Sequence, residues 1–91
     1  MLVEDIKAQL KFPVSIDVKI VMDKTLDKSL AKKTIMDICL QFNCKPLWKG
    51  QKESNGGNYI SYTVYVELES HLVFHALYME LGKIDGVKLV L

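Results

Sequence analysis

Residues 58–69 read N-Y-I-S-Y-T-V-Y-V-E-L-E, and this stretch decides the fold. From Ile60 to Leu68, every even-numbered position carries an apolar or aromatic side chain, and more polar residues or tyrosines stand between them. Side chains on a β-strand point alternately to the two faces of a sheet, so the pattern predicts a half-buried strand of about ten residues. The turn signal S-N-G-G at 54–57 precedes it. The strand therefore anchors a sheet whose second face carries tyrosines.

Two further elements are predicted before this strand. Alternation from Val14 to Met22 predicts the first strand, with residues 23–25 as its connection to a helix at 26–42. The helix carries an apolar stripe at helical spacing, made of Ala31, Ile35, Ile38 and Phe42. Asn43 is its expected stop. Residues 44–53 predict a weaker strand at a sheet edge, because Pro46 cannot donate a ladder hydrogen bond.

A second helix and a short strand are predicted after residue 69. Ser70 can cap the helix, and Gly82 suits a left-handed stop. The core stripe of this helix is expected to comprise Phe74, Leu77, Tyr78 and Leu81. The final strand should turn Val87, Leu89 and Leu91 inward.

The order β-α-β-β-α-β predicts an α+β protein with the ferredoxin-like fold. Right-handed crossovers place both helices on one face of an antiparallel sheet of strand order 4-1-3-2. The 91 residues are expected to form a single domain. Leu2, Ile6 and Leu10 recur at helical spacing and predict a short N-terminal helix, with residues 1–12 as a mobile segment.

Composition narrows the function classes. Twelve basic and eleven acidic residues give a net charge of +1, and all twelve basic residues are lysines. A protein that binds nucleic acid mainly through phosphate contacts is expected to have a strongly basic face. The balanced charge of this chain argues against that class of function. No apolar run approaches the ~18–20 residues that span a bilayer, and no secretion signal is evident. We therefore expect a soluble cytoplasmic protein.

Three stretches carry a resemblance to a known family. They are F-P at 12–13 before a strand, G-N-Y-x-S at 57–61, and L-Y-x-E-L-G-K-I-D-x-V-x-x-V-L at 77–91. Together they resemble the YbeD-like small proteins of proteobacteria, which are often labelled lipoate regulatory proteins and are otherwise of uncharacterised function. The likeness runs from Phe12 to the end of the chain. Gly86 and fewer acidic residues in the second helix depart from the family pattern.

The resemblance implies a ferredoxin-like domain similar to the ACT regulatory domain, with no established active site. The function that we expect is therefore a non-enzymatic regulatory or adaptor role through protein contact, with homodimerisation and a link to lipoate metabolism as further expectations. A fold alone does not transfer function. The first alternative is an ACT-like sensor of a small anionic metabolite, and a weaker one is binding of single-stranded RNA.

The exposed face of the sheet is the first candidate site. It is predicted to carry Asp17, Lys19, Tyr59, Ser61, Thr63 and Tyr65, with Val21, Lys88 and Val90 beside them. This face could dock a protein or a second copy, or it could simply be solvated, since aromatic residues favour strands in any case. Against RNA, an aspartate on the face would repel phosphate, and the first strand offers no aromatic for stacking.

Two smaller candidate sites involve the first helix. The loop before it supplies Asp23, Lys24, Thr25 and Lys28, where lysines near a helix N-terminus could hold an anion. On the helix itself, Leu26, Met36 and Leu40 lie off the core stripe and could form a protein interface. The plainer interpretations are a solvated basic helix face and partial cover by neighbouring side chains.

No arrangement of catalytic residues is found. The sequence lacks G-x-S-x-G, a Walker loop and G-x-G-x-x-G. His71 and His75 stand four residues apart but no third ligand accompanies them, so we expect surface histidines and no metal. Cys39 and Cys44 are spaced C-x4-C and are expected to be reduced, partly buried thiols. We expect neither an enzyme nor a cofactor.

Overall fold

The computed structural model describes residues 11–24, 26–54 and 56–91. Within these described residues, four strands and two helices follow one another in the order β-α-β-β-α-β. Their bounds are β1 Val14–Asp23, α2 Lys28–Gln41, β2 Leu47–Glu53, β3 Tyr59–Leu68, α3 His71–Gly82 and β4 Val87–Val90. The helix predicted around Leu2, Ile6 and Leu10 lies outside the described residues.

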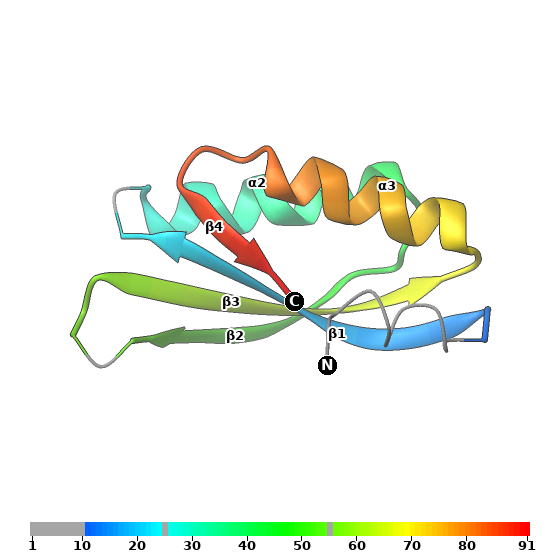
Figure 1. Ribbon diagram of the computed structural model, residues 1–91, viewed down its shortest axis with the longest axis horizontal. Coiled ribbons are helices and arrows are strands. Elements are labelled where there is room, and N and C mark those ends of the chain that lie inside the picture. Colours follow the sequence, from blue (N-terminus) through cyan, green and yellow to red (C-terminus); the bar gives the residue numbers. More distant parts are fainter. Residues whose placement is uncertain (1–10, 25, 55) are drawn as a thin grey trace.

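The strands form one antiparallel sheet in the order β2-β3-β1-β4, with α2 and α3 side by side on the same face (Figure 1). Read from the other edge, this is the predicted order 4-1-3-2, so the ferredoxin-like fold is confirmed. The two long strands pair without a break, from Val14 opposite Leu68 to Asp23 opposite Tyr59. This register puts the even-numbered residues of both strands beneath the helices.

The core lies between the sheet and the two helices. Val18, Ile20, Val64 and Val66 of the central strands are fully buried, as their alternation predicted. The helices contribute the buried residues Ala31, Ile35, Cys39, Phe74, Leu77 and Leu81. Ile38 and Phe42, which were predicted for the α2 stripe, are only partly buried, whereas Cys39 is fully buried.

Side-chain caps define the N-termini of α2 and α3. The Asp27 side chain accepts a hydrogen bond from the Leu30 backbone N–H, and the Ser70 side chain accepts one from Val73. Asn43 follows the cap of α2, as expected for the predicted stop, and its φ of +55° lies in the left-handed region. The expected left-handed stop at Gly82 is wrong: this residue is the last of α3, and Lys83 caps the helix with right-handed geometry. The left-handed glycine comes later, at Gly86 with φ +87°.

The prediction for the last strand is partly wrong. A bulge shifts the pairing between Val21 and Met22, so that Leu89 lies opposite Val21 while Val87 lies opposite Met22. Val87 and Val90 therefore pack against the core, whereas Leu89 and Leu91 are 48% and 42% exposed. One extra residue in a strand turns every side chain beyond it to the other face.

The edge strand β2 begins at Leu47, three residues later than predicted. The preceding residues are tied down irregularly around the fully buried Cys44. Its backbone N–H donates to the carbonyl of Cys39, and its carbonyl accepts from the N–H of Glu67. Lys45 follows with φ +47°, which a strand does not allow. The edge position of β2 is as predicted.

Tyr62 gives a first prediction about stability. Its ring packs near that of Trp48 with 5.6 Å between centroids, and its side chain is buried with 1% exposure. Its hydroxyl finds no hydrogen-bond partner among the residues that the structure describes. Burial, followed by the negative charge of Asp27, raises the pKa of this hydroxyl. Because an unpaired buried hydroxyl costs about 1–3 kcal/mol, we expect Tyr62→Phe to raise the free energy of unfolding by about that amount in urea denaturation.

Tyr65→Phe is the matched control for this substitution. Tyr65 lies on the same strand, but its side chain faces the other way and is partly exposed. Loss of its hydroxyl should change the free energy of unfolding by less than about 0.5 kcal/mol. A clear loss of stability in Tyr62→Phe would mean that the Tyr62 hydroxyl has a partner after all.

Candidate functional site

The face of the sheet opposite the helices, called the open face below, gathers the residues predicted for the first candidate site. Cross-strand pairing puts Asp17 beside Tyr65 and Lys19 beside Thr63. Tyr59 and Ser61, at the beginning of β3, lie on the same face, opposite Asp23 and Val21. Tyr59 is 41% exposed. All six predicted residues therefore lie on one surface, built by the two central strands.

The two edge strands add residues that the sequence interpretation missed. Leu47 lies opposite Tyr65 and Lys52 opposite Ser61, so β2 extends the open face on one side. On the other side, the bulge brings Leu89 beside Val21. Val90, predicted for this face, packs instead against the core. The alternation of β2 is interrupted between Trp48 and Gly50, which explains why its pattern did not reveal these neighbours.

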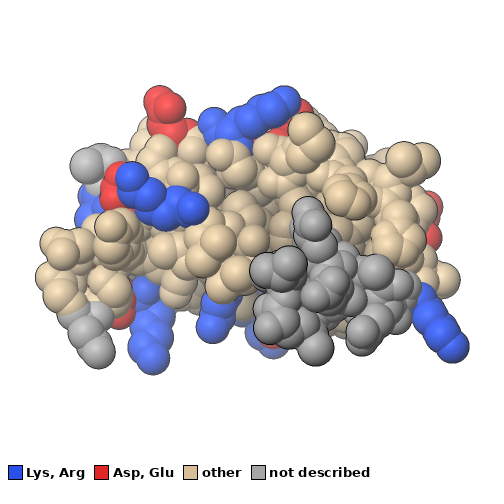
Figure 2. Space-filling model, viewed as in Figure 1, with Lys and Arg blue, Asp and Glu red and all other residues tan. Residues whose placement is uncertain are grey.

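The open face is positively charged. Lys19, Lys49 and Lys52 are exposed and have no carboxylate partner among the described residues. The Lys49 Nζ lies 6.0 Å from the centroid of the Tyr65 ring, which places it over this face. Within the described residues, Asp17 is the acidic residue of this face that has no ion pair, whereas Asp23 is paired with Lys88 at 3.4 Å. In Figure 2, lysine side chains project from the side away from the helices.

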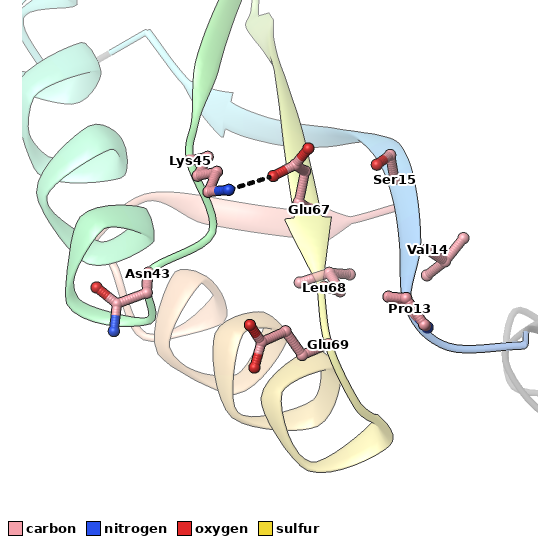
Figure 3. A pocket seen from close by; sticks show the side chains of 8 residues that line it. All are labelled: Pro13, Val14, Ser15, Asn43, Lys45, Glu67, Leu68 and Glu69. Atoms are coloured by element: carbon pink, nitrogen blue, oxygen red, sulfur yellow. Dashed lines mark ion pairs between the residues drawn. The ribbon is translucent and has the colours of Figure 1, made fainter.

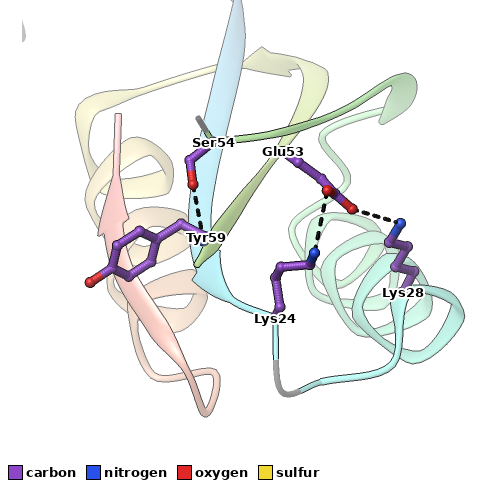
Figure 4. Close-up of polar contacts among 5 residues, drawn as sticks. All are labelled: Lys24, Lys28, Glu53, Ser54 and Tyr59. Atoms are coloured by element: carbon purple, nitrogen blue, oxygen red, sulfur yellow. Dashed lines mark hydrogen bonds and ion pairs between the residues drawn. The ribbon is translucent and has the colours of Figure 1, made fainter. Parts of the chain in front are cut away.

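A hollow of about 350 Å³ opens on this face where β3 begins. Val21, Lys52, Tyr59 and Ser61 are among the residues that line it. The β2–β3 hairpin positions Tyr59 at this hollow, because the Tyr59 backbone N–H donates to Ser54 Oγ at 3.1 Å. Figure 4 shows the Tyr59 ring extending towards β4. The hollow is therefore lined by apolar groups together with Lys52 and with Glu53, whose carboxylate is paired with Lys24 and Lys28.

The loop after β1, the second candidate site, already has an internal counterion. Lys24 and Lys28 each place Nζ 3.3 Å from a different oxygen of Glu53, as Figure 4 shows. Hydrogen bonds from the two lysines, Lys24 first, lower the pKa of Glu53. Asp23 points to Lys88 instead. Thr25 lies outside the described residues. The contact with Glu53 was not foreseen, because 25 residues separate it from Lys28.

The helix residues of the third candidate site do not form one exposed set. Leu26 and Met36 are partly buried and pack against the core. Leu40 is 58% exposed, and the nearest exposed apolar residue on its helix is Leu30, ten positions earlier. Isolated apolar side chains of this kind are ordinary on protein surfaces.

A second hollow, of about 320 Å³, lies between the start of β1 and the end of α2. Lys45 and Glu67 are paired at 3.5 Å, and Figure 3 shows Glu69 further along the chain, beyond Leu68. Pro13, Val14 and Leu68 supply apolar lining. The basic group at this hollow is thus already paired with an acidic one, and Ser15 lines the hollow opposite Glu67.

The histidines and cysteines do not build a metal site in the described part of the chain. His71 and His75 are exposed, and the His71 ring meets the Phe12 ring edge-on with 4.4 Å between centroids. Cys39 and Cys44 are free thiols, as predicted, but they are fully buried rather than partly so. Burial, with Cys44 as a smaller cause, raises the pKa of Cys39 to about 12. Burial also raises the pKa of Cys44, with Glu69 as the second cause.

These thiols should react slowly in the folded protein. At pH 8 a thiol of pKa about 12 is thiolate in roughly one molecule in 10⁴, against about one in four for an ordinary cysteine. We expect labelling of the two thiols by Ellman's reagent at pH 8 to be at least ~10²-fold slower in the native protein than in urea. Labelling of the native protein at the rate of a free thiol would contradict the buried placement.

Among residues 11–24, 26–54 and 56–91, neither helix is long and apolar enough to cross a membrane.

The geometry defines an α+β domain with the fold of ACT domains. By sequence, the chain belongs to the family described as a protein of unknown function, DUF493, whose model matches residues 7–91. This is the YbeD-like family to which the resemblance pointed. A comparison with curated proteins found no match.

Three solved structures share the fold. Protein HP0495 from H. pylori is 13% identical with a TM-score of 0.72, covering 91% of this chain and 86% of its own. The ACT domain of GTP pyrophosphokinase from Chlorobium tepidum is 12% identical with a TM-score of 0.58, covering 85% and 94%. The C-terminal domain of MgtC from Mycobacterium tuberculosis is 16% identical with a TM-score of 0.58, covering 90% and 88%. At such identities the likeness concerns the fold alone.

Proposed function

We propose that this chain is a non-enzymatic regulatory or adaptor domain that binds a protein partner through the open face of its sheet. The observation that carries the proposal is the asymmetry of the sheet. Two helices cover one face, while the other presents exposed lysines, leucines and tyrosines around a hollow. A surface that combines exposed apolar groups with unpaired charge is typical of interaction sites.

The sensor alternative has less support. An anion at the loop after β1 would have to compete with Glu53 for both lysines. The family resemblance implies further that the partner belongs to lipoate metabolism, and identification of the captured protein tests this point.

Photo-crosslinking from defined positions tests the proposal. A benzophenone amino acid at Lys52 places the reactive group on the open face, and the same group at Ser29 places it on the exposed surface of α2. In cells that make the protein naturally, we expect a discrete adduct with another protein from position 52 and none from position 29. Adducts of equal yield from both positions, or none from position 52, would contradict a role for the open face.

A further inference from the structure

We propose that the open face takes an acidic segment of a partner protein, with one apolar side chain of that segment seated in the hollow beside Val21 and Tyr59. The inference rests on the proposed function and adds the chemistry of the partner. Its first support is charge. Lys19, Lys49 and Lys52 face outward without carboxylate partners in the described chain, against Asp17 alone, so the unpaired charge of the face is +2. Carboxylates of a partner would form ion pairs with these lysines.

The hollow supplies the second feature of the occupant. Val21 and Tyr59 line it, and Leu89 lies next to Val21 across the strand pair. Lys52 lines the same hollow and opposes Ser61 on the neighbouring strand. A leucine-sized side chain could bury its surface against the apolar groups while an adjacent carboxylate reaches the lysine at the rim. The anchor supplies affinity and the charges orient the segment.

Charge and spacing disfavour two other occupants. A second copy docked face to face would bring two surfaces of charge +2 together, and like charges across an interface are destabilising. Single-stranded RNA needs free aromatic rings for stacking. Here Tyr59 and Tyr65 stand six residues apart on one strand, about 20 Å, and the Lys49 ammonium lies over the Tyr65 ring. Asp17, which opposes Tyr65, would repel phosphate.

Fluorescence anisotropy with a defined peptide tests this inference on the full chain. The probe is a fluorescein-labelled decapeptide with one central leucine among glutamates and aspartates. We expect saturable binding that weakens as salt is added. Replacing the central leucine of the probe by alanine should weaken binding at least fivefold, because the hollow is then left unfilled.

Matched variants of the protein locate the binding. Lys19→Glu with Lys52→Glu should weaken binding at least tenfold. Lys32→Glu with Lys83→Glu changes the net charge equally, at exposed positions away from the open face, and should change binding less than twofold. Ser61→Trp, which fills the hollow and leaves every charge in place, should also weaken binding at least fivefold. Thermal midpoints near that of the unaltered protein show that each variant is folded.

Several outcomes would overturn the inference. They are absence of saturable binding, equal weakening by both charge variants, tighter binding of a fluorescein-labelled uridine decamer, or a dimer in light scattering that Lys19→Glu with Lys52→Glu abolishes. If the peptide fails while position 52 still crosslinks to a protein, the partner chemistry is wrong and the proposed function stands. If position 52 yields no adduct, the proposed function itself is wrong.

Discussion

Leu77→Ala should lower the free energy of unfolding by about 2–5 kcal/mol, the usual range for a buried leucine. Leu77 is fully buried at the centre of the α3 stripe, between the helix and the sheet. The substitution removes apolar surface from the core and leaves a cavity that the packed strands can close only in part. Small domains have only about 5–15 kcal/mol of stability in total. The thermal midpoint should therefore fall by at least ~8 °C, as measured by circular dichroism.

The same helix offers a control of identical chemistry. Leu72 is 83% exposed, five residues before Leu77. Leu72→Ala removes the same atoms from water rather than from the core, so the free energy of unfolding should change by less than about 0.5 kcal/mol. Equal losses in the two variants would mean that α3 presents a different face to the sheet.

Gly50→Ala should lower the free energy of unfolding by about 1–3 kcal/mol. Gly50 has φ +130° at the bulge of β2, a conformation that only glycine adopts readily. A methyl group there would meet no atom within 4 Å, so the cost arises from backbone strain and not from a clash. The strained strand should also loosen, which faster amide hydrogen exchange in β2 would reveal.

Gly56→Ala is the control, because it replaces a glycine that does not have a positive φ. Gly56 lies in the β2–β3 hairpin without a positive φ, and an added Cβ would stand 3.6 Å from Asn58 Nδ2, an ordinary contact. This substitution should be neutral or stabilise the protein by up to about 1 kcal/mol, because it restricts the unfolded chain. If Gly50→Ala were as harmless as Gly56→Ala in urea denaturation, the bulge would not require glycine.

The sequence was informative where one face of a strand is buried along its whole length. The alternation of β1 and β3 predicted which of their residues face the core. A slip of one residue would expose Ile20 and Val64 together. The same reasoning was wrong for β4. Its four residues are too few to show a period, and the bulge that turns Leu89 outward lies in the pairing with Val21.

Long-range ionic contacts and the contributions of the edge strands were also beyond the sequence pattern. The single-strand period placed Tyr59 and Tyr65 on the open face, but Lys52 and Leu47 joined them only through the pairing of β2 with β3. Likewise, nothing local to Lys24 indicates that Glu53 pairs with it. Such contacts depend on the folded arrangement, whereas periodicity describes one segment at a time.

The central position of β1 has a consequence for synthesis. Val14–Asp23 precedes the other strands of the described sheet, yet its sheet neighbours β3 and β4 are synthesised only after α2 and β2. About 45 residues separate partners at the middle of β1 and β3, as for Val18 and Val64. At about 5–20 residues per second, β1 waits roughly 2–9 s without a partner. The pairing of β1 with β3 therefore cannot be completed until Leu68 has been added.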